Sequence, residues 1–368
     1  MAKTEHNNEI IIVASNAQAL EEKLAKYEEA PQQIVVRPSK RLKKIKKYAF
    51  KGCSQLENIE IPDSVTEIGD SAFENCTSLT SIVIPNSVTK IGWHAFGSCT
   101  RHKSIILGNS VTYIGGYAFS GCTSLKNIII PDSVTDIGCF AFNDCTGLTS
   151  MVIPDSVTAI NWSAFLHCSG LKNVVIPNSV TEIGESAFSC CEGLKNVDIP
   201  NSVTAIRRSA FYGCTSLKNA VIPDSVTEID GWAFWLCTGL KSVAIPDSVT
   251  ILDESAFWEC TELTSIVVSE GNKKYDSRNN CNAVIETSSN KLVVGCKGTI
   301  IPDSVTEIGE GAFFGCTGLR NIVIPRSVKV IGDDAFYMCR DFHIRIPRGA
   351  KVSEQTFSSC DNFSVEEY

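Results

Sequence analysis

The chain has 368 residues, of which 43% are hydrophobic and 20% are charged, and its formal net charge is -8 at pH 7. This acidic balance argues against a general nucleic-acid-binding protein, whose surface would be basic. No window holds 18 consecutive apolar residues, and no basic stretch followed by a long apolar one opens the chain. The sequence therefore predicts no membrane insertion and no visible signal peptide.

Residues 1–41 do not repeat, and we expect them to form an N-terminal cap. Glu9–Val13 and Gln33–Val36 are typical of strands, and Ser15–Glu29 carries apolar residues at helical spacing. Such a strand-helix-strand cap would cover the first sheet edge of the repetitive chain that follows. Seven Lys or Arg residues between Arg37 and Lys47 indicate either an anion-binding patch or a solvated surface of the cap.

From residue 42 onwards a unit of 23 residues recurs, and Ile61–Val83, IPDSVTEIGDSAFENCTSLTSIV, represents it. A period of this length predicts a solenoid, in which stacked units share one long core. We therefore expect one elongated domain over residues 42–360. The repeat phenylalanines are Phe50, Phe73, Phe96, Phe119, Phe142, Phe165, Phe188, Phe211, Phe234, Phe257, Phe313, Phe336 and Phe357.

Each unit divides into predictable pieces. The alternation in Leu79–Ile84 predicts a short strand, and Pro85 ends it because proline has no N–H to donate. The glycine that recurs further on, at Gly92 for example, predicts a turn with positive φ. One helical turn should follow, as in Asp70–Cys76, because a 23-residue unit cannot hold both a strand and a long helix.

Thirteen of the 17 cysteines lie three residues after a repeat phenylalanine. This spacing places both side chains on one inward face, where a free cysteine behaves as a small hydrophobe. No CxxC pair and no Cys/His cluster with zinc spacing is present in the sequence. The pattern favours buried thiols over a metal or redox site, and we expect no metal and no cofactor.

The period is interrupted once, and we expect a β-hairpin insertion at about residues 269–300 that leaves the solenoid register intact and that a short linker could replace. A two-residue turn at Ser288 and Ser289 would place Cys281 opposite Cys296 and permit a disulfide. A hairpin with two reduced cysteines is the alternative. Residues 361–368, after the repeats, should form a C-terminal cap or tail.

The consensus LxxIxIPxSVTxIGxxAFxxCxxL resembles the BspA-like class of bacterial leucine-rich repeats over roughly residues 42–360. The resemblance implies an α/β repeat fold: a right-handed leucine-rich-repeat solenoid with a short-stranded parallel concave sheet and short helical turns on the convex side. It also implies an adhesion-type protein at the cell surface or secreted, with a cytoplasmic protein as the alternative. Serine, as at Ser87, replaces the usual ladder asparagine, and its hydroxyl should bond to the backbone of a neighbouring coil.

The sequence offers no catalytic motif. Its five histidines are scattered without metal or triad spacing, and it contains no phosphate loop, nucleophile elbow or HExxH helix. An enzyme would require a site hidden in the cap or the insertion. We therefore predict that the chain is not an enzyme.

Residues that differ from coil to coil are the candidates for recognition, and aromatic residues dominate them in two columns that flank the repeat phenylalanine on the convex side. The candidate ligand-binding residues are Trp93, Tyr117, Phe140 and Trp162 in a first aromatic group and Tyr212, Trp232, Trp235 and Trp258 in a second aromatic group. Large exposed aromatic side chains usually mark a contact surface. Alternatively, some of them fold over the coil edge and fill gaps.

The strand face is the second candidate surface. One outward column holds Asn or Ser, as at Asn127, and the next is mostly aliphatic, as at Ile129. Uniform β-branched residues also simply suit a parallel sheet. We interpret the chain as a non-catalytic adhesion or recognition module for a protein or glycan partner, with a self-associating structural scaffold as the alternative.

Overall fold

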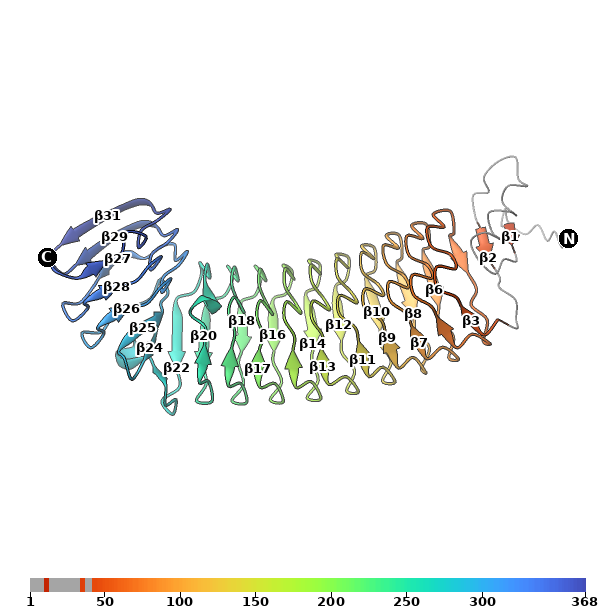
Figure 1. Cartoon of the computed structure of the whole chain (residues 1–368), viewed down its shortest axis with the longest axis horizontal. Helices are drawn as coiled ribbons and strands as arrows, with labels where there is room; N and C mark the ends of the chain where they lie inside the picture. Colours follow the sequence, from red (N-terminus) through yellow and green to blue (C-terminus); the bar gives the residue numbers. More distant parts are fainter. Residues whose placement is uncertain (1–9, 13–33, 37–41) are drawn as a thin grey trace. The chain divides into compact units, whose positions relative to one another are not determined.

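The structure is a computed structural model that describes residues 10–12, 34–36 and 42–368, in two units, Met1–Val180 and Thr181–Tyr368. Each unit is a stack of coils in which parallel strands lie side by side (Figure 1). Most coils contribute one strand to a main row and a two-residue strand to a second row. The solenoid predicted from the 23-residue period is confirmed.

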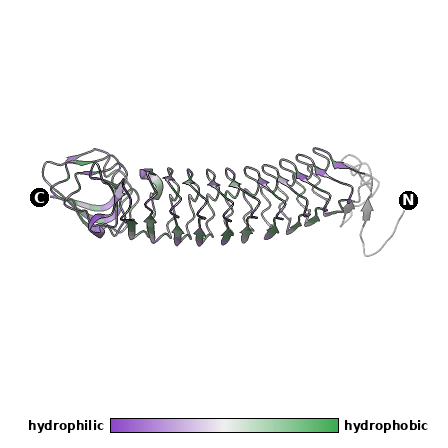
Figure 2. Cartoon of the chain, turned by 90° about the horizontal axis from the view of Figure 1, so that it is seen from below, coloured by the Kyte–Doolittle hydropathy of each residue, from purple (hydrophilic) through white to green (hydrophobic). Residues whose placement is uncertain are grey.

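In the first unit, equivalent residues of successive coils pair at the repeat spacing, as Ser81 with Ser104 and Ser104 with Asn127. The main row is β4 (Asn58–Ile59), β6 (Ser81–Val83), β8 (Ser104–Ile106), β10 (Asn127–Ile129), β12 (Ser150–Val152) and β14 (Asn173–Val175). The second row is β3 (Lys44–Ile45), β5 (Glu67–Ile68), β7 (Lys90–Ile91), β9 (Tyr113–Ile114), β11 (Asp136–Ile137) and β13 (Ala159–Ile160). In β6, β8, β10 and β12 the central residue is buried and both neighbours are exposed, as the alternation predicts. Hydrophobic residues, green in Figure 2, mark these strands.

The second unit repeats this arrangement. Its main row is β16 (Asn196–Asp198), β18 (Asn219–Val221), β20 (Ser242–Ile245), β22 (Ser265–Val268), β27 (Arg320–Val323), β29 (Arg340–Ile346) and β31 (Asp361–Glu367). Its second row is β15 (Glu182–Ile183), β17 (Ala205–Ile206), β19 (Glu228–Ile229), β21 (Ile251–Leu252), β26 (Glu307–Ile308), β28 (Val330–Ile331) and β30 (Lys351–Val352).

The N-terminal segments that the structure describes are two strands. β1 (Ile10–Ile12) pairs in parallel with β2 (Ile34–Val36), and β2 pairs with β4. Both strands fall where the sequence predicts them. The helix predicted at Ser15–Glu29 lies outside the described residues.

The repeat phenylalanine and cysteine form the centre of each coil. Phenylalanine rings of successive coils stack at 5.1 to 5.5 Å in the first unit and at 5.0 to 5.7 Å in the second. Most of the repeat cysteines donate a weak hydrogen bond to the preceding coil, as Cys122 Sγ does to the Phe96 carbonyl oxygen at 3.3 Å. Burial raises the pKa of the Cys122 thiol to about 12, so this thiol stays protonated and unreactive.

The serine column also links neighbouring coils, as predicted. Ser87 Oγ donates to the Val65 carbonyl oxygen at 2.6 Å, and Ser225 Oγ donates to that of Val203 at 2.7 Å. In each case the acceptor belongs to the preceding coil. The hydroxyl thus replaces the amide of the usual asparagine ladder.

The recurring glycine is needed for close packing, and the positive φ predicted for it is wrong. Among the described residues, those with positive φ do not include Gly92, Gly115 or Gly138. A Cβ on Gly115 would lie 2.6 Å from the carbonyl carbon of Gly92, and one on Gly138 would lie 2.5 Å from the amide nitrogen of Gly116. At these two positions the backbone of one coil therefore lies directly against the next, which the missing side chain of glycine permits.

The helical turns predicted on the convex side are also corrected. Only two short 3-10 helices occur in the described residues, Glu254–Phe257 and Arg278–Asn280, and the first alone stands at the repeat position. Elsewhere this segment is a run of tight turns with positive φ, as at Ser71 (51°) and Asn75 (62°). A right-handed helix excludes such residues.

The insertion is a hairpin that joins the solenoid stack. Its strands are β23 (Tyr275–Asp276), β24 (Val284–Glu286) and β25 (Lys291–Val294). β24 and β25 are antiparallel, and β25 pairs in parallel with β26 of the next coil. Ile285 and Leu292 are buried in the same core cluster as Phe313. A short linker in place of the insertion would uncover this core, so the structure argues against that prediction, and urea unfolding of such a variant tests it.

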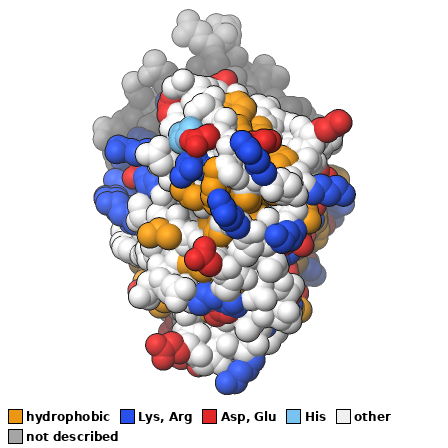
Figure 3. All heavy atoms as spheres, turned by 90° about the vertical axis from the view of Figure 1, so that its left-hand side faces the viewer, with side chains coloured by type: hydrophobic (Ala, Val, Ile, Leu, Met, Phe, Trp, Pro, Cys, Tyr) orange, Lys and Arg blue, Asp and Glu red, His pale blue; other side chains and the backbone are white. Residues whose placement is uncertain are grey.

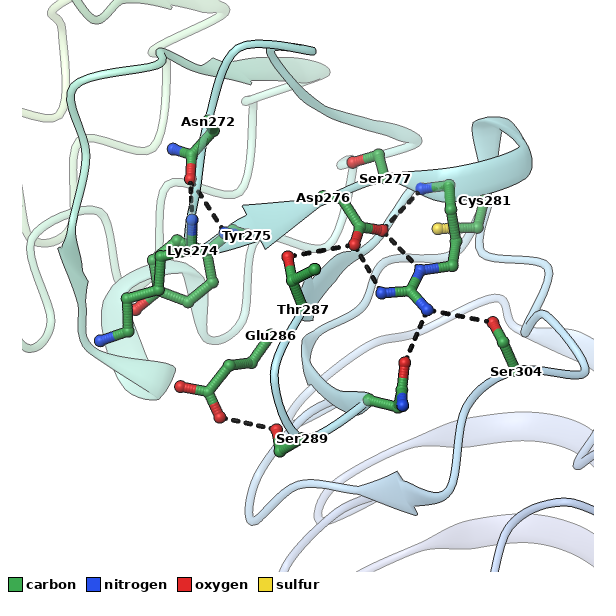
Figure 4. A network of polar contacts seen from close by, with 12 residues as sticks. Asn272, Lys274, Tyr275, Asp276, Ser277, Cys281, Glu286, Thr287, Ser289 and Ser304 are labelled. Carbon is green, nitrogen blue, oxygen red and sulfur yellow. Dashed lines mark hydrogen bonds and ion pairs between the residues drawn. The ribbon is translucent and has the colours of Figure 1, made fainter.

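Polar contacts fix the start of the insertion (Figure 4). Asn272 Oδ1 accepts the backbone N–H groups of Lys274 and Tyr275, both at 2.9 Å. Arg278 donates to Asp276 Oδ2 at 2.5 Å and to Asn290 Oδ1 at 2.7 Å. Burial alone would raise the pKa of Asp276, but hydrogen bonds from Arg278 outweigh it and lower that pKa. Because its partners lie within the insertion or in the two adjoining coils, we assign this network a structural role.

The residues predicted as a C-terminal cap or tail form β31, which pairs in parallel with β29. All seven residues of β31 are exposed. Hydrophobic side chains lie among charged ones at this end of the molecule (Figure 3), and Phe363 and Val365 are exposed.

Candidate functional site

The first aromatic group forms one row of rings in the first unit. Ring centroids are 6.3 Å apart between Trp93 and Tyr117, 4.5 Å between Tyr117 and Phe140, and 5.1 Å between Phe140 and Trp162. These are ordinary spacings for aromatic pairs. Trp93 and Trp162 are 50% and 51% exposed, and the two rings between them are half-buried. The structure thus brings together all four residues predicted for this patch.

The backbone beneath this row is strained. Tyr117 and Phe140 both have φ of 57°, a region that bulky side chains rarely adopt. The equivalent residues Ser71 and Ser163 adopt the same positive φ, at a lower steric cost because their side chains are small. The coil imposes the conformation, so an aromatic residue at this position must gain something from its ring contacts or from a partner.

Two neighbours of the row were not predicted. The His94 ring stacks on Tyr117 at 4.5 Å. The Trp93 ring lies over Gly116, where a Cβ would come within 3.3 Å of it. One side of Trp93 therefore fills the space beside a glycine, as the alternative interpretation expected, while half of its surface stays open.

The second aromatic group is packed more tightly. Trp235 lies 5.4 Å from Tyr212, 5.4 Å from Trp232 and 6.2 Å from Trp258. Its Nε1 donates to Glu259 Oε1 at 3.0 Å. All four predicted residues of this group are half-buried.

Trp258 is held from two sides. It stacks on Phe314 at 4.3 Å, and a Cβ on Gly311 would lie 2.5 Å from its Cζ2. Phe314 in turn stacks on Tyr337 at 4.7 Å. Both residues occupy the column of Trp235 and Trp258, but the insertion shifts the 23-residue count and conceals this from a search at a fixed period. The geometry favours a packing role for Trp258.

A shallow hollow of about 390 Å³ borders the second aromatic group. Arg208 lies over the Trp232 ring at 3.8 Å and lines one wall, and Glu254 and Glu310 line another. Lys291 binds Glu254 at 2.7 Å. Arg208 covers one face of the Trp232 ring, and Phe314 covers one face of the Trp258 ring. Little aromatic surface therefore remains for a ligand.

The strand face of the first unit exposes aliphatic side chains on five successive coils. They are Val83 (58%), Ile106 (60%), Ile129 (84%), Val152 (61%) and Val175 (56%), hereafter the aliphatic stripe. β-branched residues suit strands, which accounts for their type but not for their exposure. Contiguous apolar surface of this kind is uncommon on monomers and marks interaction sites.

The second unit lacks an unbroken equivalent of the aliphatic stripe. Val221 and Val267 are 60% and 52% exposed, but Asp198 and Ala244 interrupt their column. Uniform β-branched residues would favour simple sheet packing. Exposure of this column is similar in the two units, and the residue types at Asp198 and Ala244 distinguish them.

Within the described residues, no three His, Cys, Asp or Glu side chains lie close enough to hold a metal ion. No helix in that part of the chain is long and apolar enough to cross a membrane.

Cys281 and Cys296 are both free thiols, and Cys296 Sγ donates to the Asn282 carbonyl oxygen at 3.2 Å. Glu286 pairs with Lys291, which is the register that the two-residue turn predicted. A bulge next to Val284 then shifts the pairing by one residue. The disulfide stays a prediction, which mass spectrometry of the unreduced protein will test.

The sequence profile of the BspA-type leucine-rich repeat region matches the chain in overlapping segments, at residues 27–146, 94–212, 135–264, 188–294 and 285–366. A comparison with curated proteins gave no match. Among solved structures, a leucine-rich repeat protein from Bacteroides ovatus is 32% identical, and the match covers 91% of this chain and 83% of that one with a TM-score of 0.69.

Two further structures are similar at lower identity. A leucine-rich cell surface protein from Faecalibacterium prausnitzii is 27% identical, covers 82% of this chain and 83% of its own, and has a TM-score of 0.41. The pneumococcal vaccine antigen PcpA is 18% identical, with 92% and 80% covered and a TM-score of 0.50, a likeness of fold alone.

Proposed function

Because the chain belongs to the BspA-type leucine-rich repeat family, we propose that it is a non-catalytic recognition module of the adhesion type that binds a protein partner through the strand face of its first unit. The aliphatic stripe carries this proposal. Its side chains offer no hydrogen-bonding groups, so the stripe suits apolar side chains of a protein better than a hydroxyl-rich glycan.

The first aromatic group is the second contact surface that we propose. Trp93 and Trp162 each keep half of their surface open, and tryptophan combines a large apolar area with a polar N–H group. The second aromatic group remains part of the proposal, but the covered faces of Trp232 and Trp258 leave less of it for a partner.

The alternative is a self-associating scaffold in which the aliphatic stripe meets a second copy. Light scattering over a range of concentrations separates the two functions. A monomer at every concentration would count against the scaffold. Display at the cell surface or secretion belongs to the same proposal, with a cytoplasmic location as the alternative, and protease treatment of intact cells tests it.

Binding to an array of purified extracellular matrix proteins, with a glycan array in parallel, tests the recognition function. The double variant Ile106→Thr with Ile129→Thr keeps β-branched residues but removes apolar contact area. We expect it to weaken binding to any matrix protein captured by the wild type by about 2 kcal/mol, as for hot-spot residues. The matched control is Val221→Thr with Val267→Thr, which changes the same column in the second unit.

Equal binding by the wild type and the Ile106/Ile129 variant would refute a role for the aliphatic stripe. If Trp93→Ala with Trp162→Ala then abolished binding, the first aromatic group would be the contact surface. Binding on the glycan array alone would refute the protein partner.

A further inference from the structure

Charged side chains on neighbouring coils of this protein are repeatedly paired with opposite charges. Lys44 Nζ lies 2.5 Å from Glu67 Oε2, and Lys51 Nζ lies 2.8 Å from Glu74 Oε2, each across one repeat of 23 residues. The same device holds Arg340 to Asp361 at 3.4 Å. A column of lysines in the second unit has no such partners among the described residues.

That column is the lysine row of the second unit, which we define as Lys195, Lys218 and Lys241. Backbone hydrogen bonds stack the three residues, from Lys218 N to Lys195 O at 2.9 Å and from Lys241 N to Lys218 O at 3.5 Å. All three side chains are exposed. None of them makes an ion pair or a side-chain hydrogen bond within the described part of the chain.

Coils of a parallel sheet repeat at about 4.8 Å, so the lysine row holds like charges close together on a rigid ladder. Such repulsion is a cost that the paired columns avoid. Carboxylates are scarce beside the row. Glu192 and Asp198 flank Lys195, but residues 215–221 and 238–244 contain no Asp or Glu.

A polar row runs alongside the lysine row. Asn196, Asn219 and Ser242 pair in register on β16, β18 and β20, and all three are exposed. Asn219 Nδ2 donates to Asn196 Oδ1 at 3.2 Å, which aligns the amides along the stack. The two rows together present ammonium groups beside hydrogen-bonding groups, once per coil.

The first unit carries a shorter version of this arrangement. Lys103 and Lys126 occupy the same column in successive coils and are exposed and unpaired. Thr149 then interrupts the column before Lys172. The second unit therefore holds the longer uninterrupted row.

We propose that the lysine row binds a linear polyanionic polysaccharide whose chain runs along the stack of coils. Ammonium groups are point charges that pair with sulfate or carboxylate without a fixed geometry. The Asn and Ser side chains supply donors and acceptors for sugar hydroxyls. Single-stranded nucleic acid fits less well, because no aromatic residue lies in or beside the row to stack on bases. This ligand and this surface both lie outside the proposed protein-binding function.

Calorimetric titration with a heparin octasaccharide tests the proposal, with an oligogalacturonate of equal length as the carboxylate-only arm and dextran as the neutral arm. We expect the wild type to bind one or both anionic probes, more weakly as salt rises, and not to bind dextran. The triple variant Lys195→Gln, Lys218→Gln and Lys241→Gln should lose at least tenfold in affinity. Adding Lys103→Gln and Lys126→Gln should remove the remainder.

The matched control removes three exposed lysines elsewhere in the second unit, as Lys273→Gln, Lys329→Gln and Lys351→Gln, and should bind as the wild type does. A second variant works in the opposite direction. Glu192→Gln with Asp198→Asn removes the two carboxylates that flank Lys195 in the sequence and should tighten binding at least twofold. Thermal unfolding monitored by circular dichroism checks that each variant is folded.

Three results would each overturn the proposal. The first is no binding of either anionic probe by the folded wild type at physiological salt. The second is an equal loss in the control variant, which would show a general charge effect. The third is tighter binding of oligothymidylate than of both glycan probes, which would assign the row to nucleic acid. None of these results bears on the aliphatic stripe, so the recognition function stands or falls separately.

Discussion

His102 is a single polar residue in a column of buried leucines, and we predict that it makes the first unit sensitive to acid. It stands where the neighbouring coils have Leu79 and Leu125, and it is fully buried. Its Nδ1 donates to the Leu79 carbonyl oxygen at 3.1 Å, while its Nε2 is buried without a partner among the described residues. A proton added to Nε2 would therefore place an unpaired charge in the core.

The magnitude follows from the pKa. Burial lowers the pKa of His102 from 6.5 to about 4, and the hydrogen bond to Leu79 offsets this only in part. Between these two values the unfolded chain binds a proton that the folded chain does not, so the free energy of unfolding falls as pH falls. At about 1.4 kcal/mol per pH unit, the loss reaches about 3 kcal/mol at pH 4 and does not grow further below it.

The variant His102→Leu restores the residue type of the column and removes this titration. The free energy of unfolding of the wild type and of the variant is measured in urea at a series of pH values between 7.5 and 4. The difference between the two proteins reports on His102, because they share all other titrating groups. We expect the difference in the free energy of unfolding to widen by about 3 kcal/mol over that range. The control His167→Gln removes an exposed histidine and should follow the wild type. Parallel profiles for wild type and His102→Leu would refute the reasoning.

Three further predictions concern the stacked core. Phe119→Ala opens a cavity in the ring ladder and should lower the free energy of unfolding by about 3–5 kcal/mol in urea titrations; a loss below 1 kcal/mol would show that the ladder collapses around the gap. Gly115→Ala places a methyl group against the backbone of the preceding coil and should cost about 1–3 kcal/mol by the same measurement, whereas Gly97→Ala, whose nearest neighbour is 3.4 Å away, should cost less; equal losses would remove close packing as the reason for the glycine. Iodoacetamide should label the half-buried Cys190 in the native protein well before Cys122, whose thiol is buried with a raised pKa, and comparable rates by mass spectrometry would contradict that assignment.

The periodic scaffold was accessible from the sequence because its contacts repeat at the period itself. A buried phenylalanine meets the next phenylalanine 23 residues later, so one coil predicts them all, and the serine hydrogen bond follows the same logic. The glycine at position 115 was misread for a related reason. Its local sequence suggested a φ requirement, whereas the actual constraint comes from the backbone of the preceding coil.

The insertion shows where periodic reasoning stops. The interrupted period and the turn at Ser288 and Ser289 predicted the hairpin, but its pairing with β26 depends on a strand outside the hairpin. Phe314 escaped notice because the insertion displaces it from the 23-residue count. The β25–β26 pairing and the position of Phe314 could not be predicted for the same reason, because a contact that occurs once in the chain leaves no repeated pattern.

Recognition surfaces pose the opposite difficulty, because the residues that form them also repeat. Alternation already places Ile129 outward and Ile128 inward in β10, and the structure adds that Ile129 is 84% exposed with no other part of the described chain covering it. Within this solenoid, the buried thiols and the serine hydroxyls bond to a neighbour one coil away, and the glycines pack against one. Residues of the aliphatic stripe and the lysine row also have a neighbour one coil away. That neighbour is of the same type, so it neither covers the apolar side chains nor neutralises the positive charge. Repeated groups that pack or bond with one another, such as the phenylalanine rings, build the core. Repeated groups that stay exposed or repel one another, such as the aliphatic stripe and the lysine row, indicate a surface that binds a second molecule.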